Sequence, residues 1–210
     1  MCSPSPAAYL RLARVKLGWL CLLTLALALT RFAWGPVLRA ALPQGFAEES
    51  IGGTWNEAVG LTFDARGRMY VWERGGRVWI VENGVRLSPP LIDIHDEVGA
   101  WRDYGLLGVA LHPNFEQNGH IYLLYVVDHH HLKQFGTPRY DPNADEYYQA
   151  TGGRLTRYTA RAADGFRSVE PGSRRVLIGE SIGTGFPIMH QSHGTGTLLF
   201  GADGTLLVSA

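Results

Sequence analysis

Cysteine is almost absent from this sequence. The 210 residues contain two cysteines, Cys2 and Cys21, and both precede residue 22. A disulfide framework and a cysteine-based zinc site are therefore excluded from residue 22 onward. Any ligand site in that part of the chain must be built from other side chains.

The chain also lacks an excess of charge of either sign. It has 19 Lys and Arg against 19 Asp and Glu, so its formal net charge is zero with neutral histidines. Without surplus cations to neutralise phosphates, we expect no nucleic-acid partner. A hydrophobic content of 46% also excludes a disordered composition, which combines low hydrophobicity with high net charge.

No uncharged run is long enough to cross a membrane with ease, but a shorter one lies near the N-terminus. Residues 17–30 carry no charge and follow a basic patch that includes Arg11, Arg14 and Lys16. A helix of this length spans about 21 Å, which is less than the hydrocarbon core of about 30 Å. The order of a basic and then an apolar segment predicts an N-terminal hydrophobic targeting helix within residues 1–47.

Two main alternatives remain open for this segment. It is either a cleaved signal peptide or an uncleaved membrane anchor over residues 17–38. The anchor would place Arg31 in the bilayer, at a cost of about 2.5 to 3.5 kcal/mol near a helix centre. A buried core helix is a third, weaker interpretation. Both main alternatives export residues 48–210, so we expect a periplasmic or extracellular protein that meets the membrane only through its N-terminal segment.

The rest of the sequence is typical of an all-β fold with many turns. It holds most of the 26 glycines and 11 prolines, and the whole chain is 11% aromatic. Three segments repeat one pattern of apolar strand, glycine-containing turn and apolar strand, namely residues 60–71, 108–125 and 196–208. Further strands are expected between them, and Asn83-Gly84 predicts a hairpin. Four strands in about 45 residues are typical of β-propeller blades, and no helical periodicity appears after residue 40.

The length of residues 48–210 does not suffice for a closed propeller. A ring needs at least four blades, and this region supplies two to three. We therefore expect the N-terminal portion of a longer propeller, inactive when isolated because its terminal sheet face has no neighbour. A complete small β-sandwich is the alternative, because strands at this length can also pack as two sheets.

Four motifs carry a resemblance to a known family. GLLGVALHPNF at residues 105–115, with NGHIY at 118–122, resembles the second blade of soluble quinoprotein glucose and aldose sugar dehydrogenases. This is the glucose/sorbosone dehydrogenase family. RGRMYVWE at 66–73 resembles its first blade, and RLTRYT at 154–159 resembles a strand that follows the second blade. HGTGTLLF at 193–200 resembles the third-blade segment that carries the family's catalytic histidine.

The resemblance implies a fold, a cofactor and a reaction. The family has a six-bladed β-propeller that holds pyrroloquinoline quinone (PQQ) with calcium, and most of their ligands are expected beyond residue 210. A histidine takes the proton of a sugar or alcohol hydroxyl while hydride passes to the quinone. His193 matches this catalytic histidine, and an imidazole titrates near neutral pH, as a general base requires. The resemblance does not identify the electron acceptor that reoxidises the quinone.

Two positions depart from the family pattern. Asp103 stands where many members have Gln, and Tyr104 follows it, so both are candidate cofactor- or substrate-binding residues. An ionised Asp103 only accepts hydrogen bonds, whereas an amide also donates them. Ser192 stands where glucose dehydrogenases tend to have Asp. These departures leave an alternative function open, a non-catalytic carbohydrate- or protein-binding β-propeller resembling hedgehog-interacting protein.

Several other polar residues are expected to be structural. Residues 129–131 are three consecutive histidines, which point apart on an extended chain, so we expect a solvated loop without a metal. His112 is expected to fix the loop before Pro113. Arg154 and Arg157 are expected to be solvated. We predict no metal site among these groups.

Overall fold

The computed structural model describes residues 41–210. Residues 50–210 form one compact unit, and residues 41–49 lie outside it. The predicted targeting helix and the anchor over residues 17–38 lie outside the described residues, so both stay predictions. Within residues 41–210, no helix combines the length and the hydropathy needed to cross a membrane.

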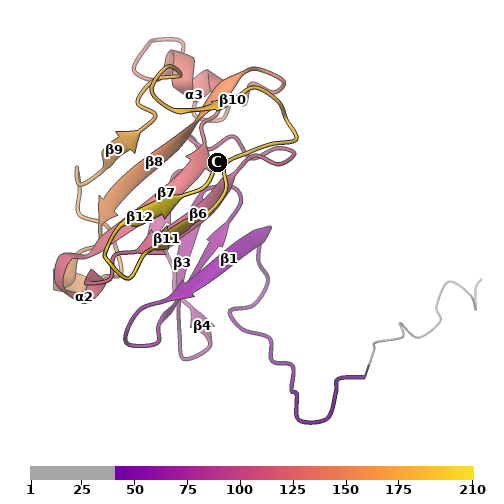
Figure 1. Ribbon diagram of the computed structural model, residues 1–210, viewed down its shortest axis with the longest axis vertical. Coiled ribbons are helices and arrows are strands. Elements are labelled where there is room, and N and C mark those ends of the chain that lie inside the picture. The colour runs from indigo at the N-terminus through magenta and orange to yellow at the C-terminus, as the bar shows by residue number, and fades with distance from the viewer. Residues whose placement is uncertain (1–40) are drawn as a thin grey trace, which may run out of the picture. The chain divides into compact units, whose positions relative to one another are not determined.

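The first sheet of the compact unit is an antiparallel meander (Figure 1). Its strands are β1 (Ala58–Phe63), β2 (Met69–Glu73), β3 (Arg77–Glu82), β4 (Val85–Arg86) and β5 (Ile92–Asp93). The hairpin predicted at Asn83-Gly84 connects β3 to β4, and both residues have positive φ, 52° and 77°. This is the backbone that a two-residue turn needs to follow the twist of the strands, and Asn and Gly tolerate it best.

The second sheet repeats this plan. Its strands are β6 (Leu106–Leu111), β7 (His120–Val126), β8 (Thr151–Thr159), β9 (Arg175–Ile178) and β10 (Phe186–Ile188). In both sheets the outermost position is shared by two short strands. β4 and β5 pair with opposite ends of β3, and β10 and β9 pair with successive parts of β8.

A third, two-stranded element follows, made of β11 (Leu198–Phe200) and β12 (Leu206–Val208). The three repeats predicted from the sequence are confirmed as the hairpins β1–β2, β6–β7 and β11–β12. Strand β6 contacts both β1 and β11, so the first strands of the three sheets are neighbours. A Cβ added to Gly108 in β6 would lie 3.2 Å from the backbone nitrogen of Leu198 in β11. The architecture is mostly β and propeller-like.

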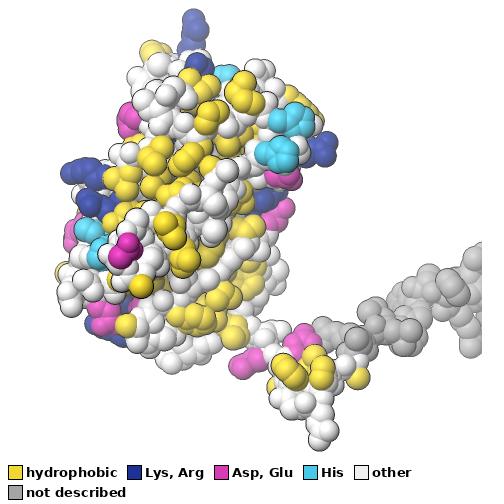
Figure 2. All heavy atoms as spheres, in the orientation of Figure 1, with side chains coloured by type: hydrophobic (Ala, Val, Ile, Leu, Met, Phe, Trp, Pro, Cys, Tyr) yellow, Lys and Arg dark blue, Asp and Glu magenta, His cyan; other side chains and the backbone are white. Residues whose placement is uncertain are grey.

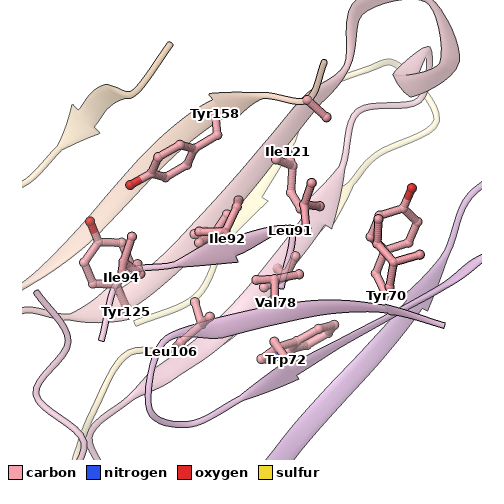
Figure 3. Close-up of a cluster of buried hydrophobic side chains, with 14 of the residues drawn as sticks. Tyr70, Trp72, Val78, Leu91, Ile92, Ile94, Leu106, Ile121, Tyr125 and Tyr158 are labelled. Atoms are coloured by element: carbon pink, nitrogen blue, oxygen red, sulfur yellow. The ribbon is translucent and has the colours of Figure 1, made fainter. Parts of the chain in front are cut away.

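The main hydrophobic core lies between the first and second sheets (Figure 3). Alternate residues of β7 point to it, and Ile121, Leu123 and Tyr125 are fully buried there. The intervening residue Leu124 is buried on the opposite face, in a second cluster with Leu198 of β11. A two-sheet sandwich would bury one face of each sheet, whereas here the second sheet is covered on both faces.

Helical turns are the first correction to the sequence predictions. The structure has α2 (Phe115–Asn118), α3 (His129–Gln134) and the 3-10 turn η1 (Ala162–Asp164), although no helix was expected after residue 40. Helix α3 contains the histidine triplet that was expected to form a solvated loop. It forms because the Asp128 side chain accepts hydrogen bonds from two backbone N–H groups of the first turn. His131 is buried, and this burial lowers the pKa of its imidazole.

Arg154 is the second correction, because it is buried rather than solvated. Its side chain is 6% exposed and donates a hydrogen bond of 2.5 Å to the carboxylate of Glu97, which is equally buried. Arg174 donates to the same carboxylate oxygen at 2.6 Å. The Tyr125 hydroxyl also donates to Glu97 at 2.5 Å. Strand periodicity cannot distinguish a solvated arginine from one that enters the space between two sheets to meet a carboxylate.

Candidate functional site

Two loops far apart in the sequence meet at the end of β10. The backbone N–H of Asp103 donates to the carbonyl oxygen of Gln191 at 3.4 Å. A Cβ added to Gly194 would collide with the carbonyl oxygen of Asp103 and would lie 3.0 Å from the Leu107 side chain. Only glycine allows this approach without a shift of the backbone. The structure therefore brings the segments of Asp103 and His193 together.

His193 stands at the surface of this junction. It closes a turn in which its N–H donates to the His190 carbonyl oxygen at 3.3 Å, and its side chain is exposed. Figure 2 shows histidine side chains gathered at the edge of the visible face, near the loop that follows β10. The ring of His193 lies 6.5 Å from that of His190 and has no hydrogen-bond partner among residues 41–210. Its nitrogens are thus available to a ligand.

Ser192 does not orient His193. Its hydroxyl lies 2.7 Å from Nδ1 of His190, and its backbone N–H donates to the same atom at 3.2 Å. The two residues form a local turn that holds the imidazole of His190 in place. Two residues after His193, the hydroxyl of Thr195 is buried without a hydrogen-bond partner in the described part of the chain.

The two other predicted site residues differ in their surroundings. The side chain of Asp103 is exposed, beside the exposed Arg102, whose backbone has a φ of 54°. Tyr104 is 2% exposed and packs with Trp101, Val126 and Ile188. This burial raises the pKa of the Tyr104 phenol. Asp103 can meet a ligand directly, whereas Tyr104 mainly anchors the loop that presents it.

Arg74 holds this loop against the first sheet. Its Nη1 donates to the carbonyl oxygens of Arg102 and Tyr104 at 3.1 and 3.3 Å. Its Nη2 meets both carboxylate oxygens of Glu57 at 2.8 Å. The planar guanidinium serves both partners at once, which a point charge on lysine cannot do. Arg74 lies in the turn after β2 and in no recognised motif, so sequence analysis did not identify it.

We expect Arg74→Met to lower the free energy of unfolding by about 1 to 2 kcal/mol, because two hydrogen bonds to loop carbonyls are lost. Amide exchange should accelerate in residues 102–107. Urea denaturation and hydrogen-exchange mass spectrometry measure the two effects. Glu57→Gln is the matched control, because it removes an exposed ion pair, worth about 0 to 1 kcal/mol, and leaves the loop contacts in place. Equal exchange rates in the wild type and Arg74→Met would contradict this role.

Metal ligands do not converge in the described part of the chain. Residues 41–210 contain no group of three or more His, Cys, Asp or Glu side chains that could hold a metal ion. His112 is structural as predicted, because its Nδ1 accepts from the backbone N–H of Asn114 at 3.0 Å and lies 2.9 Å from the Asn118 amide. Calcium, which the resemblance implies, has no ligand set here.

Sequence comparison identifies the family. The profile described as glucose/sorbosone dehydrogenase matches residues 55–210. The chain belongs to this family. The HIPL2 protein of Arabidopsis thaliana is 26% identical to this family member over 191 residues, which cover 78% of this chain and 26% of that protein. Hedgehog-interacting protein of Mus musculus is 27% identical over 150 residues, covering 69% of this chain and 19% of its own.

A solved structure supports the fold. An oxidoreductase from Thermus thermophilus, described as a glucose dehydrogenase, superposes with a TM-score of 0.53 at 26% identity. The match covers 76% of this family member and 38% of that chain. The chain thus spans about a quarter or less of the two curated relatives and well under half of the solved structure.

Proposed function

We propose that the protein is an exported quinoprotein oxidoreductase that oxidises a sugar or a related alcohol, with His193 as general base. The observation that carries this proposal is the exposed imidazole of His193, without a partner in residues 41–210, at the junction with the Asp103 loop. Membership of the glucose/sorbosone dehydrogenase family supports the reaction class. The family's six-bladed ring is part of the proposal, because the described residues form two sheets and one hairpin.

The residues present fit PQQ in part. PQQ carries carboxylates and quinone oxygens, which accept hydrogen bonds. Arg102 is exposed and makes no ion pair within residues 41–210, so its guanidinium is available to a carboxylate. The hydroxyl of Thr195 also lacks a partner in the described part of the chain, but it is buried and does not face a ligand. An ionised Asp103 would repel an anion, so we assign PQQ contact here to Arg102 and sugar contacts to Asp103.

Oxidation of a carbinol removes a proton from its oxygen and a hydride from its carbon. When bound, PQQ supplies the acceptor for that hydride. A ring nitrogen of His193 accepts the hydroxyl proton, which its exposed position and free nitrogens allow. Asp103 accepts a hydrogen bond from a neighbouring sugar hydroxyl and so orients the ring. Tyr104 and Arg74 keep the Asp103 loop at its place beside Gly194.

A second candidate function is a binding propeller without catalysis. Asp103 favours it, because a carboxylate replaces the amide found in many family members. The 27% identity to hedgehog-interacting protein also favours it. We give priority to the oxidoreductase because His193 is retained and presented at the surface.

Reconstitution of the full-length protein with PQQ and calcium tests the proposal. We expect stoichiometric PQQ binding, and dye reduction with aldoses that appears in the periplasmic or culture fraction of the expressing cells. Export would follow from the targeting segment proposed for residues 1–47. Asp103→Gln, assayed in parallel, should change sugar preference and retain PQQ. If neither the wild type nor Asp103→Gln binds PQQ, the result would instead support the binding propeller.

A further inference from the structure

A pocket of about 210 Å³ opens beside the candidate site. Its lining includes the aromatic residues Trp101, Tyr104 and Tyr148, which meet at Trp101 and form an aromatic wall, together with Met189, His190 and Gln191. The two loops that bring Asp103 and His193 together line the pocket with the segment before β8, and the rings of His190 and His193 are 6.5 Å apart. It is smaller than pockets for drug-sized ligands, which begin at about 300 Å³, so one small ring is a suitable occupant.

The aromatic wall is held in place but stays accessible. The centroid of Trp101 lies 4.8 Å from that of Tyr148, 5.2 Å from that of Tyr147 and 5.1 Å from that of Tyr104. Tyr148 is nevertheless 73% exposed, and its φ of 62° is uncommon for a bulky residue. A strained backbone that presents an exposed ring is a feature of ligand-binding loops.

Gln191, which also lines the pocket, carries an unused polar group. The side-chain oxygen of Gln191 is buried and has no hydrogen-bond partner in the part of the chain that the structure describes. A buried acceptor without a donor is unfavourable, so such groups usually have a partner that binds or rotates into place. Gln149 adds a second amide to the pocket lining. No Asp, Glu, Lys or Arg among residues 41–210 lines it.

These features select a neutral, polyhydroxylated ring. A pyranose has apolar C–H groups on its faces, which stack on aromatic rings, and hydroxyls around its rim, which bond to amides. A quaternary ammonium would also stack on the aromatic wall, but cation sites gain much from a nearby carboxylate, which this lining lacks. An anion would meet no guanidinium or ammonium group.

We propose that this pocket is a subsite for a second sugar ring, which makes a disaccharide or a larger glycoside the preferred substrate. The choice of the reacting ring at His193 rests on the proposed function, whereas binding in the pocket does not. Tyr148 supplies the stacking face and Gln191 the amide that selects hydroxyls. Both are specificity-determining residues, and neither takes part in the proton transfer.

The test uses the full-length protein without PQQ, titrated calorimetrically with cellobiose, maltose, glucose and choline. We expect a disaccharide to bind at least 10-fold more tightly than glucose. Tyr148→Ala and Gln191→Leu should each remove most of that difference. Tyr147→Ala is the matched control, because its ring contacts Trp101 but does not line the pocket. The affinity of Tyr147→Ala for the disaccharide should stay within twofold of that of the wild type.

The PQQ-loaded protein separates this inference from the proposed function. Tyr148→Ala should raise the KM for the disaccharide about 10-fold and leave kcat, as well as glucose oxidation, unchanged. Suppose that the wild type and Tyr148→Ala each have the same kcat/KM for glucose as for disaccharides. This result would overturn the subsite and leave the proposed dehydrogenase activity in place. Disaccharide binding without any turnover would support the subsite and refute the dehydrogenase. Tighter binding of choline than of any sugar would also overturn the subsite.

Discussion

We expect His193→Ala to lower kcat of the reconstituted full-length protein by about 10²- to 10⁴-fold, the usual effect of removing a general base. PQQ binding should change little, because the proposed cofactor contact in this region belongs to Arg102. The measurement is dye reduction under saturating sugar, with PQQ titrated separately by absorbance. The variant lacks the proton acceptor and keeps the loop, so the loss should lie in kcat and not in KM.

Stability supplies the control for this variant. The side chain of His193 is exposed and unpaired within residues 41–210, so its removal should shift the unfolding free energy by no more than about 0.5 kcal/mol. A folded, PQQ-binding His193→Ala protein with wild-type kcat would refute the assignment. A variant that loses PQQ as well would show that His193 holds the cofactor and does not act as a base.

Replacement of Glu97 by Gln should have the largest effect on stability, a loss of about 3 to 5 kcal/mol in the free energy of unfolding. The carboxylate accepts from Arg154, Arg174 and Tyr125. Its removal leaves Arg154, which is 6% exposed, without a counter-charge between the two sheets. Urea denaturation at pH 7 measures the loss. Glu116→Gln is the control, because it breaks an exposed pair with Arg66, worth about 0 to 1 kcal/mol.

The same carboxylate sets a dependence on pH. Burial by itself raises the pKa of Glu97, but Arg174 and the Tyr125 hydroxyl, together with Arg154, outweigh it and lower the pKa below its ordinary value. A group with a lowered pKa stabilises the fold above its unfolded pKa, about 4.3 for Glu, and this contribution disappears as pH falls through the folded pKa. The difference in unfolding free energy between the wild type and Glu97→Gln should therefore decrease below about pH 4. A difference that is constant down to pH 2 would contradict the ionised pair.

The parts of the fold that sequence analysis predicted are those fixed by local chemistry. Asn83-Gly84 and the three strand-turn-strand repeats depend on neighbouring residues, and the structure has them at the expected positions. The prediction that Arg154 is solvated was wrong. The sequence could not show its burial, because its partner Glu97 is 57 residues away and lies in no motif. The helix at residues 129–134 was missed because one cap, Asp128, decides it.

The candidate site likewise has a part that the sequence predicted and a part that only the folded chain reveals. His193 was found through a motif, and its nearness to Asp103 follows from a contact that only the folded chain makes. The pocket beside it depends on Tyr148, a residue of the long segment between β7 and β8 that no periodicity or motif marks. The tilted ring contact between Trp101 and Tyr148 joins residues 47 positions apart, and the sequence offered no signal for it.

The divided outer edges of the two sheets bear on behaviour at high concentration. A long, straight edge strand presents a continuous row of free N–H and C=O groups on which another chain can add as a further strand. Here β4 and β5 interrupt one such row, and β9 and β10 interrupt the other. An incoming segment on these outer edges would meet at most four residues in register, because β9 is the longest of the four strands and has four residues. The outer edges of both sheets thus oppose edge-to-edge aggregation in concentrated solution.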